Sequence, residues 1–244
     1  MVMVSVILPV YNESECINKT FDSVLEYSQK KESYHFIFVN DGSTDNTAEI
    51  LAKRVSSTNL NKFTLVSYAA NKGKGYAVKK GVEQAKGDYI CFIDSDLAYS
   101  LDHLELLVDK LQEFDVVIGC RNLVPENLTQ PKLSRRLSGM VFNLISRKIF
   151  NLHYRDMQAG LKGFRNAVAK ELFKNQKSSG FSFDVELLCL AKKQGYFIGE
   201  IPARISEKHR YKISKVNLIK DSIRMFIELL AIKLRGLFWS CGDK

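Results

Sequence analysis

The chain has 244 residues, of which 45% are hydrophobic, and its formal net charge is +9. That length suits one α/β domain, or one domain with a small addition, and it is long enough to bury a substantial core. The five cysteines are scattered and form no C-x-x-C pair, which argues against a disulfide framework or a structural zinc site and favours a reducing cytoplasm. No run approaches the roughly 20 apolar residues of a membrane span, so we expect neither a span nor a signal peptide.

Strand-like and helix-like segments alternate along the chain. Short β-rich apolar runs predict strands, and apolar positions at helical spacing predict helices between them. The predicted strands are 4–8, 35–39, 63–67, 89–93, 116–118 and 198–201, and the predicted helices are 13–29, 44–55, 76–85, 101–112, 133–150 and 183–193. Thr44 or Asp45 is the expected cap of the second helix. This βαβ alternation predicts a mostly parallel sheet with helices on both faces.

Polar side chains follow three of the predicted strands. They are Tyr11, Asn12 and Glu13 after the first strand, Asn40 and Asp41 after the second, and Asp94 and Asp96 after the fourth. The carboxyl ends of parallel strands meet at one edge of the sheet, where ligands bind. Acids at these three ends therefore predict one site for a sugar, a nucleotide and a metal. No G-x-G-x-x-G follows the first strand, which argues against a Rossmann dehydrogenase.

Asp94 and Asp96 end the apolar run 89–93. Side chains two residues apart in a strand point the same way. Two like charges side by side repel each other unless a cation or a proton lies between them. A divalent cation would explain both acids, whereas the alternative, a helix N-cap ahead of Leu101, explains only one of them.

The carboxyl-terminal part of the chain is basic. Residues 208–235 hold eight Lys or Arg against two Asp or Glu, which predicts an anionic partner. Apolar residues recur there at helical spacing, at Ile219, Ile223, Phe226, Leu230, Leu234 and Leu237. The pattern predicts an amphipathic helix, either at an anionic membrane surface or packed on the domain or on a twin subunit. We accordingly divide the chain into a domain, 1–207, and a basic amphipathic segment, 208–244.

Six motifs in chain order resemble those of family-two glycosyltransferases with the GT-A fold. They are VSVILPVYNE, VNDGSTDNT, NKGKGYAVKKG, FIDSDL, RDMQAGLKGF and FDVELL, and they span most of the chain, from residue 4 to about 190. The last two are most similar to dolichyl-phosphate β-glucosyltransferases. Dolichyl-phosphate mannose synthases come second, and the segment around Ser214-Lys215 is similar to theirs.

This resemblance implies an inverting, metal-dependent hexosyltransferase that moves a sugar from a nucleotide sugar, with UDP-glucose expected, to a polyprenyl phosphate. Two alternatives stay open, a GDP-mannose-dependent polyprenyl-phosphate mannose synthase and a family-two enzyme acting on a soluble or surface glycan. A nucleic-acid-binding module, suggested by the pI of about 9.2, is a poor alternative because acids crowd the predicted ligand edge.

On the donor side, the resemblance implies that Asp96 binds Mg²⁺ or Mn²⁺ and that Asp94 binds ribose or the metal. The nucleotide-sugar pocket is expected to include Pro9, Tyr11, Glu13, Asp41, Lys74 and Asp94, with Tyr11 stacking on the base. Glu13 has a second interpretation as a first-turn helix acid. The mannose enzymes carry a Gln ligand where this chain has Ala98, so water would take its place.

The glycines and lysines of residues 71–75 open a predicted helix. Glycines allow close backbone approach, and a helix start favours an anion, so this segment is a candidate for holding a phosphate. An ordinary Gly-Lys turn is the alternative.

On the acceptor side, a lipid phosphate is already largely ionised at neutral pH and needs no strong base, whereas an alcohol would need one. Asp184 and Glu186 are the candidate base or orienting groups, or else a helix cap and a first-turn acid. The expected acceptor-phosphate contacts are Arg121, Arg135, Arg136, Gln158, Lys162, Arg210 and Lys215. We expect a peripheral enzyme on the cytoplasmic face of a membrane, and a homo-oligomer is compatible with the sequence.

Overall fold

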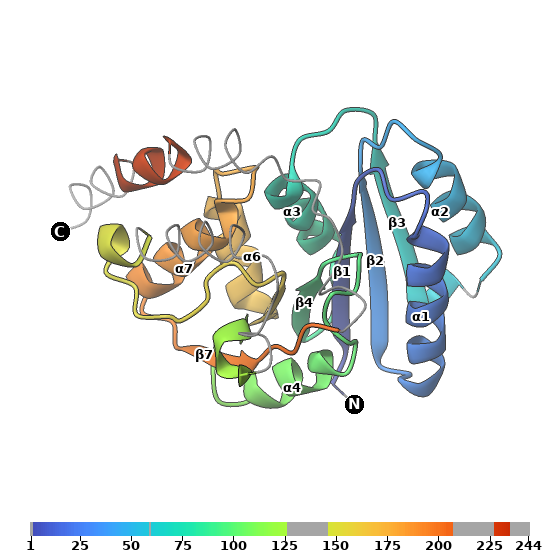
Figure 1. Ribbon diagram of the computed structural model, residues 1–244. Coiled ribbons are helices and arrows are strands. Elements are labelled where there is room, and N and C mark those ends of the chain that lie inside the picture. The colour runs from blue at the N-terminus through green and yellow to red at the C-terminus, as the bar shows by residue number, and fades with distance from the viewer. Residues whose placement is uncertain (1, 59, 126–145, 207–226, 235–244) are drawn as a thin grey trace.

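The computed structural model describes residues 2–58, 60–125, 146–206 and 227–234. Its strands form a seven-stranded sheet in the order β3-β2-β1-β4-β6-β5-β7 (Figure 1). The strands are β1 Val4–Val10, β2 Tyr34–Asp41, β3 Phe63–Tyr68, β4 Tyr89–Ile93, β5 Val116–Cys120, β6 Leu161–Arg165 and β7 Ile198–Pro202. β6 lies antiparallel to both its neighbours, β4 and β5, and the other adjacent pairs are parallel. The predicted mostly parallel sheet is confirmed.

Helices cover both faces of the sheet. They are α1 Ile17–Lys30, α2 Thr47–Ser56, α3 Lys74–Gln84, α4 His103–Lys110, α6 Asn166–Asn175 and α7 Phe183–Lys193, with short 3₁₀ turns at Leu60–Lys62 and Arg121–Leu123. Residues 146–150 and 227–234 are also helical.

Strand alternation divides the core into two layers. In β2, Phe36 and Phe38 join a cluster with α1, α2 and α4, whereas Ile37 and Val39 join a cluster with α3, α6 and α7. Successive side chains of a strand point to opposite faces, so a strand covered on both sides reads as a continuous apolar run. α3 lies directly on β1, because a Cβ on Gly81 would come within 2.4 Å of Cγ2 of Ile7.

Some element boundaries differ from the predicted ones for local reasons. α1 begins at Ile17 rather than at residue 13, because the backbone N–H groups of Cys16 and Ile17 donate to the carbonyl of Glu13 in a preceding turn. α2 begins at Thr47, and Oδ1 of Asp45 accepts the Thr47 N–H at 3.0 Å. The N-cap residue is Asn46 rather than the predicted Thr44 or Asp45, although Asp45 still accepts a backbone N–H at the helix start. Thr44 bonds to Asn12 across the adjacent loop.

β6 and α6 were not predicted. The charged Lys162 interrupts the apolar pattern of β6, although its side chain is fully buried in the folded protein. α6 carries buried Val168, Leu172 and Phe173 at helical spacing, a signal that the sequence does contain.

The described part of the basic segment, 227–234, has two apolar faces. Leu229 and Ile232 are buried in the cluster that includes α7, so the division at residue 207 does not separate this stretch from the core. Leu230 and Leu234 of the predicted stripe are exposed, as is Ile227. Ile219, Ile223, Phe226 and Leu237 lie outside the described residues. Within the described ranges, every helix is too short or too polar to cross a membrane.

Candidate functional site

The loops after β1 and β2 interlock at the carboxyl edge of the sheet. The backbone N–H of Asn12 donates to Oγ of Ser43 at 3.0 Å, and that of Glu13 donates to Oγ1 of Thr47 at 2.9 Å. Asn12 has a positive φ of 51°, which turns the chain sharply after β1. Tyr11 is 42% exposed beside this turn, a position from which its ring is open to a planar ligand.

Asp41 organises the loop that precedes α3. Oδ1 accepts the Tyr68 hydroxyl and the Lys72 N–H, both at 2.8 Å. Oδ2 accepts the Asn71 side-chain amide and the Gly73 N–H, both at 2.9 Å. A carboxylate has about four acceptor positions, and these bonds fill them. The Asp41 carboxylate therefore holds the 71–73 loop in place, and its expected nucleotide contact stays a prediction.

The glycines of residues 71–75 allow close packing against protein backbone rather than against a phosphate. The N–H groups of Gly75 and Tyr76 donate to the carbonyl of Ser179, at 2.8 and 3.3 Å. A Cβ on Gly73, whose φ is +98°, would lie 2.5 Å from that same oxygen, and one on Gly75 would lie 2.7 Å from Cβ of Phe183. The expected anion position at this helix start is thus taken by the 178–180 loop, which brings α3 against the start of α7.

Lys74 reaches from α3 to Asp94 at the end of β4. Its Nζ lies 2.5 Å from Oδ1 of Asp94, and the lysine side chain is only 16% exposed. Burial lowers the pKa of Lys74, but Asp94 and Asp184 outweigh that effect and raise it above its ordinary value. Lys74 is therefore a held positive charge beside the predicted metal-binding acids.

Gly160 provides the space that Asp94 occupies. A Cβ on Gly160 would lie 1.8 Å from Oδ2 of Asp94, and the Asp94 N–H donates to the Gly160 carbonyl at 3.0 Å. Gly160 belongs to the motif RDMQAGLKGF, but no role was predicted for it. The signal that could have found it is a glycine within an otherwise bulky strand-like run.

The loop after Asp94 holds Asp96 in place. Oδ1 of Asp96 accepts the Ala98 N–H at 3.0 Å, and Leu97 between them has a positive φ of 49°. A positive φ is uncommon for a bulky residue such as leucine and marks a constrained turn. The chain returns to this loop after β7, where the Ser206 N–H donates to the Ala98 carbonyl at 2.9 Å. Ser206 therefore contacts the Asp96 loop just before the basic segment begins at residue 208.

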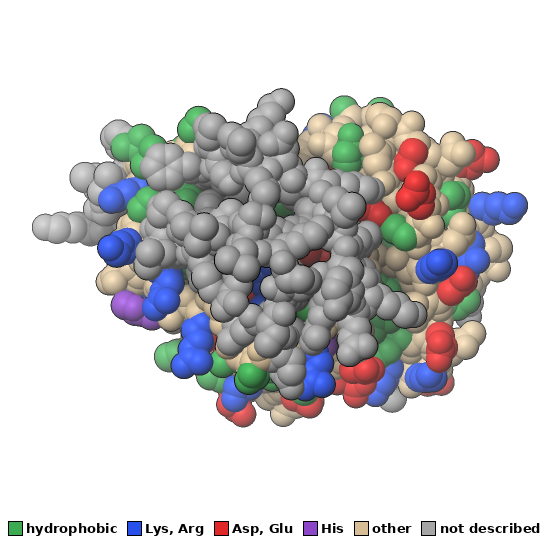
Figure 2. All heavy atoms as spheres, in the orientation of Figure 1, with side chains coloured by type: hydrophobic (Ala, Val, Ile, Leu, Met, Phe, Trp, Pro, Cys, Tyr) green, Lys and Arg blue, Asp and Glu red, His purple; other side chains and the backbone are tan. Residues whose placement is uncertain are grey.

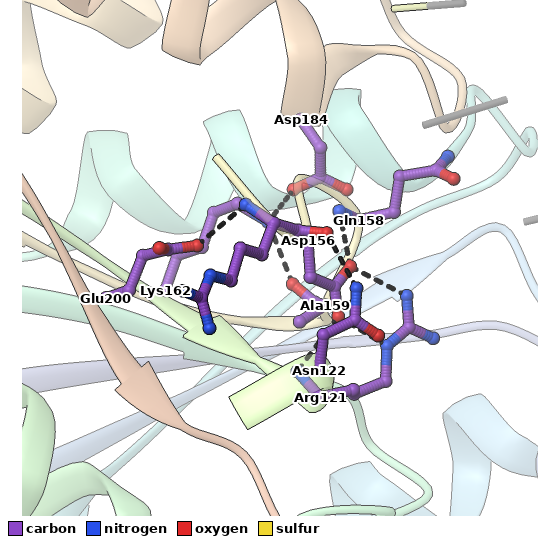
Figure 3. A network of polar contacts seen from close by, with 9 residues as sticks. Arg121, Asn122, Asp156, Gln158, Ala159, Lys162, Asp184 and Glu200 are labelled. Atoms are coloured by element: carbon purple, nitrogen blue, oxygen red, sulfur yellow. Dashed lines mark hydrogen bonds and ion pairs between the residues drawn. The ribbon is translucent and has the colours of Figure 1, made fainter. Parts of the chain in front are cut away.

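Lys162 and Asp184 form a buried ion pair between β6 and α7 (Figure 3). Nζ of Lys162 lies 2.7 Å from Oδ1 of Asp184, and the two side chains are 0% and 4% exposed. The same Nζ donates to the Ala159 carbonyl at 2.8 Å. Lys162 was expected to bind the acceptor phosphate, but its ammonium is enclosed and engaged with protein oxygens. Asp184 was expected to cap its helix if it had no function, and the structure shows no such cap bond.

Arg121 pairs with Asp156 rather than presenting a free guanidinium. Nε lies 2.6 Å from Oδ2 and an Nη lies 2.8 Å from Oδ1, a bidentate arrangement (Figure 3). Burial raises the pKa of Asp156, but the Arg121 guanidinium lowers that pKa by a larger amount, so it lies below its ordinary value. The backbone N–H of Gln158 also donates to Asp156, at 3.2 Å. Arg121 is therefore held in place by Asp156, while its side chain stays 39% exposed.

Glu186 has a local structural role. Its carboxylate accepts the backbone N–H groups of Lys177 and Ser178, with the shortest bond at 2.7 Å, and it is 2% exposed. This leaves Asp184 as the acid at the start of α7 that faces the site. The predicted acceptor contacts Arg135, Arg136, Arg210 and Lys215 lie outside the described residues.

Phe92 brings the two lysine ammonium groups together. The Nζ atoms of Lys74 and Lys162 lie 5.8 and 5.5 Å from the centre of its ring, a distance at which a cation is attracted to an aromatic face. The described site thus has two neighbouring groups of charged side chains, one with Lys74, Asp94 and Asp96 and the other with Lys162 and Asp184. Within the described ranges, no cluster of three His, Cys, Asp or Glu side chains is arranged for a metal, so a cation at Asp94 and Asp96 would need ligands from the substrate or water.

The sequence profile of glycosyl transferase family 2 matches residues 5–173. The chain belongs to this family. Dolichyl-phosphate beta-glucosyltransferase ALG5C of Trichomonas vaginalis is 31% identical over 254 residues, covering 98% of this chain and 73% of that protein. The dolichyl-phosphate beta-glucosyltransferase of Saccharomyces cerevisiae is 28% identical, with 97% and 75% covered.

Solved structures share the fold. Glucosyl-3-phosphoglycerate synthase of Mycobacterium tuberculosis, in complex with Mn²⁺, UDP and glucosyl-3-phosphoglycerate, superposes with a TM-score of 0.69. The two chains are 19% identical, and the match covers 96% of this chain and 79% of that one. The expected GT-A architecture is confirmed, and the chain is a glycosyltransferase.

Replacing Gly160 by Ala should displace the Asp94 carboxylate, because the added methyl group has no space beside Oδ2. We expect sugar transfer to fall by about tenfold or more, since small misplacements at a reacting centre are costly. Gly180→Ala is the matched control, because its Cβ would meet only the movable carboxylate end of Glu228, at 3.0 Å. Transfer rates and melting temperatures of both variants give the test, and full activity of Gly160→Ala would contradict the assigned contact.

Proposed function

We propose that this glycosyltransferase moves glucose from UDP-glucose to a polyprenyl phosphate of the dolichyl type, with inversion at C1 of the sugar. The observation that carries the proposal is the gathering of two charged groups beside the Phe92 ring, Lys74 with Asp94 and Asp96 at the end of β4, and Lys162 with Asp184 at the start of α7. Similarity to dolichyl-phosphate beta-glucosyltransferases over nearly the whole chain supports the sugar and the acceptor.

The donor binds at the carboxyl ends of β1 and β4 in this proposal. Tyr11 stacks on the base, and Pro9 and Glu13 line the pocket, since the interlocked loops hold these residues at the sheet edge. Asp41 orders the neighbouring loop through its bonds to Lys72 and Gly73, and it remains a predicted nucleotide contact. Lys74 lies where it can move from Asp94 to the donor diphosphate and stabilise the negative charge that develops as the nucleotide leaves.

Asp94 and Asp96 fit a Mg²⁺ or Mn²⁺ site. Both are partly exposed at the end of a rigid buried strand, and they offer only oxygen ligands, as these cations prefer. A bond from Ala98 fixes Oδ1 of Asp96, so its carboxylate orientation is set before any ligand binds. When bound, the cation supplies charge neutralisation to the leaving diphosphate. Structural neighbours crystallised with UDP and Mn²⁺ or Mg²⁺ agree with this choice.

The acceptor approaches from the side of Asp184. A phosphate monoester is mostly ionised near pH 7, so it attacks C1 without a strong general base. Asp184 then orients the acceptor or the sugar. Arg121, held by Asp156, and the side chain of Gln158 lie along the same wall (Figure 3). Arg135, Arg136, Arg210 and Lys215 remain predicted phosphate contacts.

The protein associates peripherally with the cytoplasmic surface of a membrane in this proposal. Ile227, Leu230 and Leu234 are 60%, 42% and 58% exposed, and Phe181, just before α7, is 44% exposed. Figure 2 shows hydrophobic side chains at the surface where Figure 1 places the helix 227–234. This exposed apolar face belongs to the basic segment 208–235, a combination suited to an anionic bilayer.

A transfer assay tests the reaction directly. The protein is incubated with polyprenyl phosphate, Mg²⁺ or Mn²⁺, and labelled UDP-glucose, GDP-mannose or other nucleotide sugars in parallel. We expect a chloroform-soluble labelled product from UDP-glucose that disappears with excess chelator, because the leaving diphosphate then lacks its cation. A product from GDP-mannose alone would identify a mannose synthase, and label appearing only on a soluble glycan would reject the lipid acceptor.

Liposome flotation tests the membrane proposal. Each basic side chain near an anionic bilayer contributes on the order of 1 kcal/mol, and salt weakens this attraction. We expect the protein to float with anionic liposomes at low salt, and Leu230→Ser/Leu234→Ser to float less while keeping the wild-type melting temperature, since both residues are exposed. Leu229→Ser, at a buried position of the same helix, is the control that should lower the melting temperature instead. Absence of flotation by the wild-type protein at low salt would refute the proposal.

A further inference from the structure

We infer that Lys162 is a positioning residue for Asp184, whose carboxylate its buried ammonium holds in the ionised form and in one orientation at the acceptor side. The inference rests on the proposed function, in which Asp184 meets the acceptor or the sugar. It assigns Lys162 a role that differs from the phosphate contact expected from the sequence.

The position of Lys162 in the sheet explains its reach. β6 runs antiparallel between β4 and β5, so Lys162 pairs with Phe92 on one side and with Ile118 on the other. Its side chain leaves the centre of the sheet toward the α7 layer, fully enclosed, and ends 2.7 Å from Oδ1 of Asp184. A second bond, to the Ala159 carbonyl, fixes the ammonium from the turn before β6.

The charged groups around Asp184 come from three elements. Lys162 on β6 and Lys74 on α3 favour its ionised form, while burial and Asp94 at the end of β4 oppose it. The net effect raises the pKa of Asp184 above its ordinary value, with burial as the largest cause. Burial and the repulsion from Lys74 lower the pKa of Lys162, while the attraction of Asp184 and Asp156 raises it. The net effect is a pKa below the ordinary value. Each partner therefore depends on the other to remain charged.

A structural role alone does not account for this pair. Replacing a buried ion pair by apolar side chains of similar volume is often neutral or stabilising, so such pairs are weak evidence for stability. Apolar residues surround this one, including Phe92 and Phe183, and would accept an apolar neighbour. Oδ1 of Asp184 lies against the ammonium but accepts no aligned hydrogen bond. The contact therefore acts mainly by stabilising the negative charge of the Asp184 carboxylate. An anionic group kept beside the reaction path is what the pair provides.

Thermal unfolding against pH tests the pair without any substrate. In Lys162→Met, an ionised Asp184 has lost its closest counter-charge, so its folded pKa rises further above the unfolded value. A carboxyl group with a raised folded pKa destabilises the protein increasingly as the pH rises through that pKa. We therefore expect the melting-temperature deficit of Lys162→Met to be small at acid pH and to grow toward neutral pH. The double variant Lys162→Met/Asp184→Asn should remove the pH dependence and recover most of the deficit.

Lys170→Met is the matched control for this measurement. Lys170 also joins two elements, but its ammonium donates to the carbonyl oxygens of Val82 and Glu83 instead of pairing with a buried carboxylate. The melting-temperature deficit of Lys170→Met should not grow between acid and neutral pH. If Lys162→Met does not fold, the double variant decides: its recovery supports the pairing, and its failure to recover overturns it.

The pH dependence of transfer tests the positioning role. The limb set by the second ionisation of the acceptor phosphate, near pH 6, is common to all variants. In the plot of kcat/KM against pH, we expect the acid limb of Lys162→Met to lie about one to three pH units higher than that of the wild type. This is the pKa change expected when an adjacent opposite charge is lost. The affinity for UDP, measured by calorimetry, should stay within about twofold of wild type, because the pair lies on the acceptor side.

These outcomes separate the inference from the function on which it rests. A wild-type protein that transfers no sugar to polyprenyl phosphate refutes the proposed function, while the unfolding series still tests the pair. A melting deficit in Lys162→Met that is independent of pH, together with an unchanged acid limb, would show that Lys162 only joins β6 to α7 and would overturn the inference.

Discussion

Lys162 places its side-chain amine in the interior of the sheet, where a positive charge is tolerated only with a partner. That partner, Asp184, is the second residue of α7, so the pair fixes where α7 starts relative to β6. The 178–180 loop before α7 in turn accepts the first N–H groups of α3, and α3 places Lys74 against Asp94. One buried ion pair thus helps to set the distance between the two sides of the site.

Close backbone approach is the second constraint. Gly75 admits Phe183, Gly73 admits the Ser179 carbonyl, and Gly160 admits the Asp94 carboxylate. In each case a single methyl group would separate elements that come from distant parts of the sequence. The glycines therefore let β4, α3, the turn before β6 and the start of α7 approach one another, with the centre of the Phe92 ring 5.8 and 5.5 Å from the two ammonium groups.

Much of this architecture could be predicted from the sequence, because buried parallel strands are continuous apolar runs and their carboxyl ends carry polar residues. β4 and α7 were predicted with the bounds observed, and Asp94, Asp96 and Asp184 lie on the two sides of one site. Pairings between side chains far apart in the chain could not be predicted. Asp41, Arg121 and Lys162 have the residue types expected of ligand contacts, and only the fold shows that protein groups already engage them.

The central claim is that the nucleotide and its cation bind at the end of β4, apart from the acceptor side at α7. Binding of Mn²⁺ in the presence of UDP, followed by electron paramagnetic resonance, tests it most directly. The account predicts that Asp96→Ala weakens Mn²⁺ binding by about tenfold or more, as loss of a ligand or its support does, whereas Asp184→Asn binds like the wild type. Equal binding by Asp96→Ala and the wild type, or a loss confined to Asp184→Asn, would contradict it.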